Sequence, residues 1–177
     1  ALWSLGVTRL SGIFLSHADA DHYNALPGVL RRFGVQQIIT PPGMMQESEG
    51  ALAAARSAID QAGVPIREMC HGDRIRIGRC SIEVLHPPVE RIPGSDNANS
   101  LVLRIDHGAS TLLLPGDLEP PGTLSLIRQP RPPVGCALMA PHHGSVTMDA
   151  HSVLQWSRPR DVIVSGGQRA QRPEVSE

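Results

Sequence analysis

Short apolar runs that alternate with helical patterns constrain the fold of this chain more than any other feature. In the first third, residues 13–15, 37–39 and 66–70 are predicted strands, and residues 23–33 and 48–62 between them have the pattern of helices. Strands connected through helices are typical of an α/β layer architecture. We therefore expect a sheet with two helices on its outer face.

The middle of the chain has a different pattern, that of short strands separated by turn residues. Antiparallel pairing is predicted for residues 73–77, 81–85, 101–105 and 111–114. The turn Asp106-His107-Gly108 predicts a hairpin between the last two of these strands, and the Pro-, Gly- and Asn-rich residues 86–99 predict an irregular loop.

The βα pattern returns in the last third of the chain. Helices are predicted over residues 124–128 and 150–156, and strands over 136–139 and 161–164. We also expect a helix at residues 1–5, where the chain begins without Met or a signal-like segment.

Composition excludes several classes of protein. The 177 residues, 41% hydrophobic and 19% charged, fit one folded domain without a disordered tract, and no apolar run approaches the roughly 20 residues of a membrane-spanning helix. A net charge of −1 argues against broad electrostatic capture of nucleic acid, and three cysteines without a CxxC pair predict neither a disulfide framework nor a cysteine zinc site. We expect residues 1–177 to form a single domain that is part of a longer chain.

Four potential metal ligands directly follow the strand at residues 13–15. His17, Asp19, Asp21 and His22 lie within six residues, immediately before a predicted helix. In an extended turn, alternate residues project to one side, so that this loop can supply ligands to two metal ions. Each residue alone would be interpreted as part of an ordinary polar turn in which Asp caps the helix.

Two later strands end in turns of the same kind. Residues 111–114 lead through Pro115 and Gly116 to Asp117, and residues 136–139 lead to His142 and His143. Adjacent histidines at the end of a strand are rarely core residues, because both rings would need buried partners. The three turns together supply the ligand set of a two-metal hydrolytic site.

The other histidines have no such spacing. They are expected at the surface or in turns: His71, His86, His107 and His151.

These motifs carry a family resemblance. The segment His17-x-Asp19-x-Asp21-His22 resembles the HxHxDH motif of the metallo-β-lactamase superfamily, with Asp in place of the second His. Gly116-Asp117 resembles the bridging aspartate of that superfamily, and His142-His143-Gly144-Ser145 its late histidine motif. The strings SHADADHYNAL, NANSLVLRI, LLLPGDLE and APHHGS are similar to the C-terminal domain of ComEC-type DNA internalisation proteins.

The resemblance implies an α/β fold, an αββα sandwich of two mixed sheets that is truncated at both ends, with the site at one edge between the sheets. It implies two divalent metal ions, Zn or Mn, held by His17, Asp19, Asp21, His22, Asp117 and His142. Asp21 would orient the attacking water and His143 would contact the phosphate or leaving group. The sequence leaves open whether His142 and His143 exchange roles.

One departure from the superfamily pattern concerns the metals. Relatives usually have a His ligand before the strand that leads to the bridging Asp, whereas this chain has Asp96-Asn97-Ala98-Asn99-Ser100. Because Asp19 also replaces a softer His ligand, we expect Mn²⁺ to compete with Zn²⁺.

The function that the resemblance implies is a nuclease that acts on single-stranded DNA during uptake in natural competence. The parent protein would be embedded in the inner or plasma membrane, with this domain outside the cytoplasm. Fold does not determine function, so two alternatives stay open. One is a small-molecule or phosphocholine esterase-like hydrolase, and the other is a non-catalytic DNA-binding or structural module. The sequence does not predict an oligomeric state.

Overall fold

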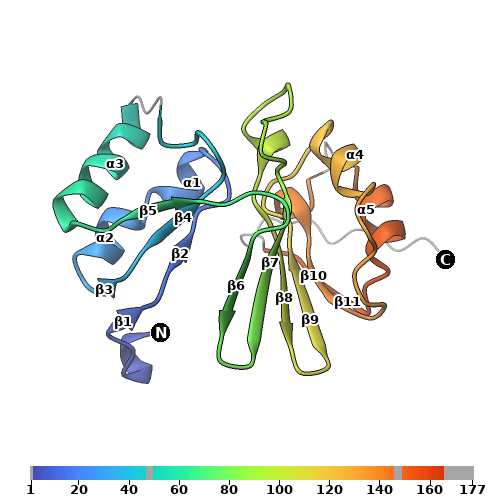
Figure 1. The fold of residues 1–177 in the computed structure, drawn as a ribbon, viewed down its shortest axis with the longest axis horizontal. Helices are drawn as coiled ribbons and strands as arrows, with labels where there is room; N and C mark the ends of the chain where they lie inside the picture. The colour runs from blue at the N-terminus through green and yellow to red at the C-terminus, as the bar shows by residue number, and fades with distance from the viewer. Residues whose placement is uncertain (1, 47–49, 146–148, 166–177) are drawn as a thin grey trace.

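Two β-sheets face each other, and helices cover the outer side of each, so that the molecule has four layers (Figure 1). The structure is a computed structural model that describes residues 2–46, 50–145 and 149–165. Buried apolar side chains form three clusters, one at each interface between layers. The layer order helix, sheet, sheet, helix confirms the αββα architecture expected from the sequence.

The smaller sheet consists of three parallel strands. They lie in the order β2 (Ile13–Phe14), β4 (Ile38–Thr40) and β5 (Ile66–Glu68). Ile38 packs in the cluster under the helices and Ile39 in the cluster between the sheets, because successive side chains of a strand point to opposite faces. Both are fully buried, which explains why this part of the sequence is apolar without alternation.

A second parallel pair was not expected from the sequence. Strand β1 (Arg9–Leu10) pairs with β3 (Gly34–Val35). Strands of two residues are too short to show a hydrophobic period, so the pattern could not predict them.

Three helices cover the outer face of the smaller sheet: α1 (Ala20–Tyr23), α2 (Leu26–Leu30) and α3 (Gly50–Ala62). The expectation of one helix over residues 23–33 is wrong, because the structure has two short helices that start and end earlier. Pro27 explains the break. Proline has no N–H to donate to the carbonyl four residues earlier, so it is accommodated only at the start of a helix.

Two other predicted helices begin at positions that lie outside the described residues. The helix expected over residues 48–62 is α3, and positions 48 and 49 lie outside the described residues. The helix expected at residues 1–5 is instead a single 3₁₀ turn, Trp3–Leu5, with residue 1 outside the described part. It ends at Gly6, whose backbone is left-handed (φ 73°).

The larger sheet is mixed. Its first four strands in the sequence form an antiparallel meander, and its last two add parallel strands beyond it. In spatial order the strands are β11 (Asp161–Ile163), β10 (Ala137–Met139), β9 (Ser110–Leu114), β8 (Val102–His107), β7 (Cys80–His86) and β6 (Arg74–Ile77). The predicted hairpin is confirmed between β8 and β9, and Gly108 adopts the positive φ of its turn (61°).

Helices α4 (Gly122–Leu126) and α5 (Ala150–Ser157) cover the outer face of the larger sheet (Figure 1). Helix α4 begins two residues before its predicted start, and α5 begins where predicted, after Asp149. The carboxylate of Asp149 accepts a hydrogen bond from the backbone N–H of Ser152 (3.1 Å), which caps the helix. Within the predicted loop 86–99, the last three residues form a 3₁₀ turn.

The state of the cysteines and the lengths of the helices also agree with the expectations from the sequence. The three cysteines are free thiols. No helix in the described part of the chain is long and apolar enough to cross a membrane.

His86 is not at the surface, and the expectation for it is wrong. It is 1% exposed, and its Nε2 lies 2.9 Å from the carbonyl oxygen of Ala98. The reason is tertiary, because the loop that follows β7 folds back over its end. Burial lowers the pKa of His86 to about 4. The histidines at 71, 107 and 151 are exposed, as expected.

This lowered pKa predicts a pH dependence of stability. The unfolded state binds a proton at His86 below pH about 6.5, whereas the folded state does so only near pH 4. Stability is therefore complete above pH about 6.5 and falls as the pH drops towards 4, by about 3 kcal/mol in total. Denaturant unfolding of metal-free wild type and of His86→Gln between pH 7 and 4 measures this loss. Parallel stability curves for the two proteins would contradict the prediction.

Candidate metal centre

Three turns at strand ends meet at one edge of the molecule, between the two sheets. They are residues 16–22 after β2, 115–117 after β9 and 141–144 after β10. Strands β9 and β10 are parallel, so their carboxyl ends lie at the same edge. The first turn is connected to the larger sheet by a backbone hydrogen bond from Leu101 N–H to the carbonyl of Ser16 (2.8 Å).

The carboxylate of Asp117 lies at the middle of this junction. Its side chain is only 6% exposed, and His22 Nε2 lies 3.3 Å from Oδ1. Three further Nε2 atoms lie 3.7–3.9 Å from Oδ2, those of His143, His142 and His17. Four imidazole rings from two turns thus face one buried carboxylate.

Two more carboxylates lie at the rim. Asp19 Oδ2 is 3.4 Å from His17 Nε2, and Asp21 Oδ2 is 3.6 Å from the Nε2 atoms of both His22 and His143. The side chain of Asp21 is 66% exposed. The centre is therefore closed on its inner side and open to solvent at Asp21.

The tightest group consists of Asp21, His22, Asp117 and His143. One ligand atom from each lies within 4.8 Å of all the others, and the described residues contain no second group of this kind. His17, Asp19 and His142 reach the same centre through the contacts given above. The structure thus brings all seven predicted site residues together, whereas their roles as ligands stay predictions.

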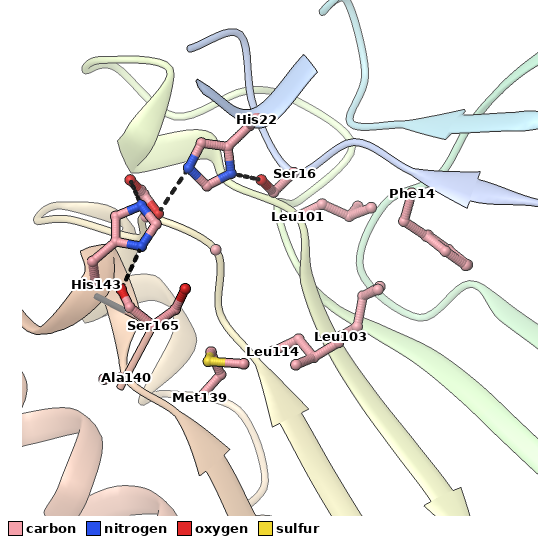
Figure 2. A pocket seen from close by; sticks show the side chains of 12 residues that line it. Phe14, Ser16, His22, Leu101, Leu103, Leu114, Met139, Ala140, His143 and Ser165 are labelled. Atoms are coloured by element: carbon pink, nitrogen blue, oxygen red, sulfur yellow. Dashed lines mark hydrogen bonds and ion pairs between the residues drawn. The ribbon is translucent and has the colours of Figure 1, made fainter. Parts of the chain in front are cut away.

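Each ring also has a partner for its other nitrogen. Nδ1 of His17 and Nδ1 of His22 lie 3.0 and 3.1 Å from Ser16 Oγ. Nδ1 of His142 lies 2.9 Å from Glu119 Oε1, and Nδ1 of His143 lies 3.1 Å from the carbonyl oxygen of Ser165. Figure 2 shows the bonds of His22 to Ser16 and of His143 to Ser165. Nδ1 of His17, of His22 and of His143 thus each bond to an oxygen, whereas Nδ1 of His142 lies at ion-pair distance from Glu119 without a hydrogen bond among the described residues, and every Nε2 faces the centre.

The donor set fits divalent cations. Nε2 of His17 and of His22 is buried without a hydrogen-bond partner among the described residues, which by itself costs about 1–3 kcal/mol per group. Imidazole nitrogens and carboxylate oxygens are ligands for Zn²⁺ and Mn²⁺. A cation between the rings and Asp117 would satisfy both orphaned nitrogens.

The protonation state of His17 agrees with this interpretation. Burial lowers its pKa, and the neighbouring ring of His22 (centroids 4.2 Å apart) lowers it further, against the opposing effect of Asp117. His17 is therefore neutral at pH 7, as a metal ligand must be.

The paired histidines have an unusual backbone. His142 (φ 46°, ψ 45°) and His143 (φ 54°, ψ 19°) both adopt the left-handed conformation, which costs a non-glycine residue about 1–3 kcal/mol. A hydrogen bond from His142 N–H to the carbonyl of Gly116 (3.1 Å) holds this turn against the one that carries Asp117. The two rings, 70° apart in plane, approach Asp117 separately as a result. Strain of this kind is typical of functional sites.

Residues 96–100, where the superfamily pattern led us to expect a His ligand, have a structural role. Asn99 is buried, and its amide bonds both to the backbone of Ile92 (3.0 Å each way) and to the carbonyl of Ser95 (3.2 Å). Its side chain thus holds the preceding loop. These hydrogen bonds give the asparagine at this position a role in the structure of the loop.

A cavity of about 280 Å³ adjoins the centre between the sheets (Figure 2). His22, Asp117 and His143 line one end of it. Most of the other lining side chains are apolar: Phe14, Leu101, Leu103, Leu114, Met139 and Ala140. The inner side of the centre is thus largely apolar, whereas its outer side carries the exposed carboxylates.

Three groups at the site were not assigned a role from the sequence. Ser16 bonds to Nδ1 of two rings, and Glu119 lies beside Nδ1 of a third. Each is within two positions of a predicted ligand, so a nearby acidic or hydroxyl residue was the available signal. The third group is the carbonyl of Ser165. Because it is a backbone group, no residue type could reveal it.

Comparison with known proteins adds family information. The family described as "Beta-lactamase superfamily domain" matches residues 4–138. The curated protein "ComE operon protein 3" of Bacillus subtilis is 32% identical over 94% of this chain and 21% of that protein. "Competence protein ComA" of Neisseria gonorrhoeae is 29% identical over 94% of this chain and 21% of that protein. The chain therefore spans about a fifth of the length of these relatives.

Among solved structures, the zinc-bound PqqB of Methylobacterium extorquens is similar in fold. It matches with a TM-score of 0.48 and 13% identity over 73% of this chain and 46% of that one.

Proposed function

The chain belongs to the beta-lactamase superfamily, with the metallo-β-lactamase fold, and on that premise we propose that it hydrolyses the phosphodiester backbone of DNA. The observation that carries the proposal is the buried Asp117 carboxylate with four Nε2 atoms 3.3–3.9 Å from it. Such a set of side chains would hold two divalent ions. The similarity to competence proteins supports DNA as the substrate.

Six side chains would hold the ions: His17, Asp19, Asp21, His22, Asp117 and His142. Nε2 of His17, His22 and His142 lies 3.3–3.9 Å from the Asp117 carboxylate, and Asp19 and Asp21 each contact one of these rings. Divalent cations there would lower the pKa of water to about 7 and neutralise charge on a phosphate.

Side chains of this protein orient the water and contact the substrate. The exposed carboxylate of Asp21 accepts a hydrogen bond from the attacking water and orients it towards phosphorus. His143, 43% exposed, lies beside Asp21 and contacts the phosphate or leaving group on the open side. Glu119 holds His142 in position through Nδ1.

Single-stranded DNA is the form of substrate that we propose. With a net charge of −1, affinity must come from contacts at the site and not from a general field, so binding is weak and independent of base sequence. We place the activity in DNA uptake during natural competence, where it degrades the strand that is not transported. The chain would work outside the cytoplasm as one domain of a membrane-embedded protein.

The direct test is hydrolysis by the metal-loaded full-length protein. Labelled single-stranded DNA, double-stranded DNA and a small phosphodiester are incubated separately, and products are resolved by electrophoresis or chromatography. Cleavage of single-stranded DNA is the expected result. Turnover of the small ester alone would favour a small-molecule hydrolase, and no turnover with fully bound metal would favour a non-catalytic module.

Metal preference is a further prediction. Because three of the seven site side chains are hard carboxylates, Mn²⁺ should restore activity to metal-stripped protein within about tenfold of Zn²⁺. Activity is measured after chelation and titration with each metal. Full activity with Zn²⁺ and none with Mn²⁺ would show that ligand hardness does not govern this site.

A further inference from the structure

We propose that Ser16 is a positioning residue that sets the tautomer of two metal-ligand histidines at once. Its Oγ lies 3.0 Å from Nδ1 of His17 and 3.1 Å from Nδ1 of His22. One hydroxyl therefore contacts the non-coordinating nitrogen of two neighbouring rings. The inference rests on the proposed metal centre but not on DNA as its substrate.

The number of protons on each ring determines which nitrogen is free to bind a metal. A neutral imidazole carries one N–H, and a metal requires the lone pair of the nitrogen that it binds. The Nε2 atoms of both rings point towards Asp117 and have no hydrogen-bond partner in the described part of the chain. The protons therefore belong on the two Nδ1 atoms. A hydroxyl oxygen has two lone pairs, so Ser16 Oγ can accept both hydrogen bonds.

Backbone hydrogen bonds to both sheets fix the position of Ser16. On one side, Leu15 N–H donates to the carbonyl of Ile39 in the smaller sheet (2.9 Å), and on the other, the carbonyl of Ser16 accepts from Leu101 N–H at the start of β8 (2.8 Å). The side chain packs on Gly116, where an added Cβ would lie 2.9 Å from Ser16 Cβ. The hydroxyl is thus anchored by long-range contacts and cannot follow the rings if they move.

Loss of this acceptor should affect both rings. Without Ser16 Oγ, nothing among the described contacts holds either Nδ1 proton, and the Nε2–H tautomer, which cannot bind a metal through the nitrogen that faces Asp117, becomes populated. Removal of an outer-shell partner typically weakens metal affinity about 10–100-fold.

The test uses a matched pair of serine variants. Ser100 also lies beside Gly116, where it is buried, but none of its described contacts is to a histidine ring, so Ser100→Ala removes the same kind of atom from the same neighbourhood. In ¹⁵N-labelled metal-free protein at pH about 8.5, two-bond ¹H–¹⁵N correlation spectra report the tautomer of each ring. Signals are assigned with His17→Gln and His22→Gln.

The expected result is Nδ1–H at both rings in wild type and Ser100→Ala, and a shift towards Nε2–H in Ser16→Ala. Mn²⁺ and Zn²⁺ affinities, measured by competition with a chelator, should fall about 10–100-fold in Ser16→Ala only. Recovery in Ser16→Thr would assign the effect to the hydroxyl. Unchanged tautomers in folded Ser16→Ala, or an equal loss of affinity in Ser100→Ala, would overturn the proposal. Failure to cleave DNA would count against the proposed function and leave these spectra unaffected.

Discussion

Asp117→Asn is expected to abolish the binding of metal ions and to lower DNA cleavage by more than about 100-fold. The effect should exceed that of losing an outer-shell partner, because this carboxylate is the one group that all four histidines face. Asparagine keeps the shape but removes the negative charge that balances the cations. Metal content by mass spectrometry of the folded variant and initial cleavage rates give the measurement.

Asp106→Asn is the matched control for this substitution. Asp106 is a partly buried aspartate of β8, where it accepts hydrogen bonds from Arg104 Nε (2.9 Å) and Thr111 Oγ1 (2.7 Å). It lies at the hairpin end of β8, away from the three turns, so metal content and cleavage should stay at the wild-type level. If Asp117→Asn bound two ions as tightly as Asp106→Asn does, the assignment of Asp117 would be wrong.

Asp21→Ala is expected to stop turnover while leaving the fold intact. The substitution removes both a ligand of the tightest group and the carboxylate that orients the attacking water, so cleavage should fall by more than about 100-fold. Because the side chain is 66% exposed, the free energy of unfolding of the metal-free protein should change by no more than about 0.5 kcal/mol. Cleavage assays and denaturant unfolding measure the two effects.

Asp60→Ala provides the comparison for Asp21. Asp60 is similarly exposed, at 60%, and forms an ion pair with Arg56 on α3, far from the turns in the sequence. Its loss should affect neither metal content nor cleavage. A natively folded Asp21→Ala protein that degrades DNA at the wild-type rate would refute the mechanism.

The sequence predicted the fold best where a local pattern is long enough to show a period. The strands of the meander and helix α5 are confirmed close to their predicted bounds, because alternation or helical spacing extends over several residues there. The predictions were wrong where the pattern was short or where a single residue overruled it. Pro27 divided one expected helix into two, and the pair of β1 with β3 was too short to predict.

In the candidate site, too, some features could be predicted from the sequence and others could not. The sequence alone predicted which turns carry the ligands, because His17, Asp117 and His142 each lie three residues after the end of β2, β9 or β10. Residue types and chain order settle that much without any knowledge of distant contacts.

The way in which those side chains face one another depends on tertiary contacts. The backbone bond from Leu101 to Ser16, the strained turn at His142 and His143, and the buried position of His86 all depend on segments far apart in the chain. A ring nitrogen is directed by the partner of its opposite nitrogen, and for His22, His142 and His143 that partner lies 6, 23 and 22 residues away. The oxygen beside Nδ1 of His142 belongs to Glu119, and no periodicity or spacing within one turn contains such a contact, because it exists only after β9 and β10 have paired.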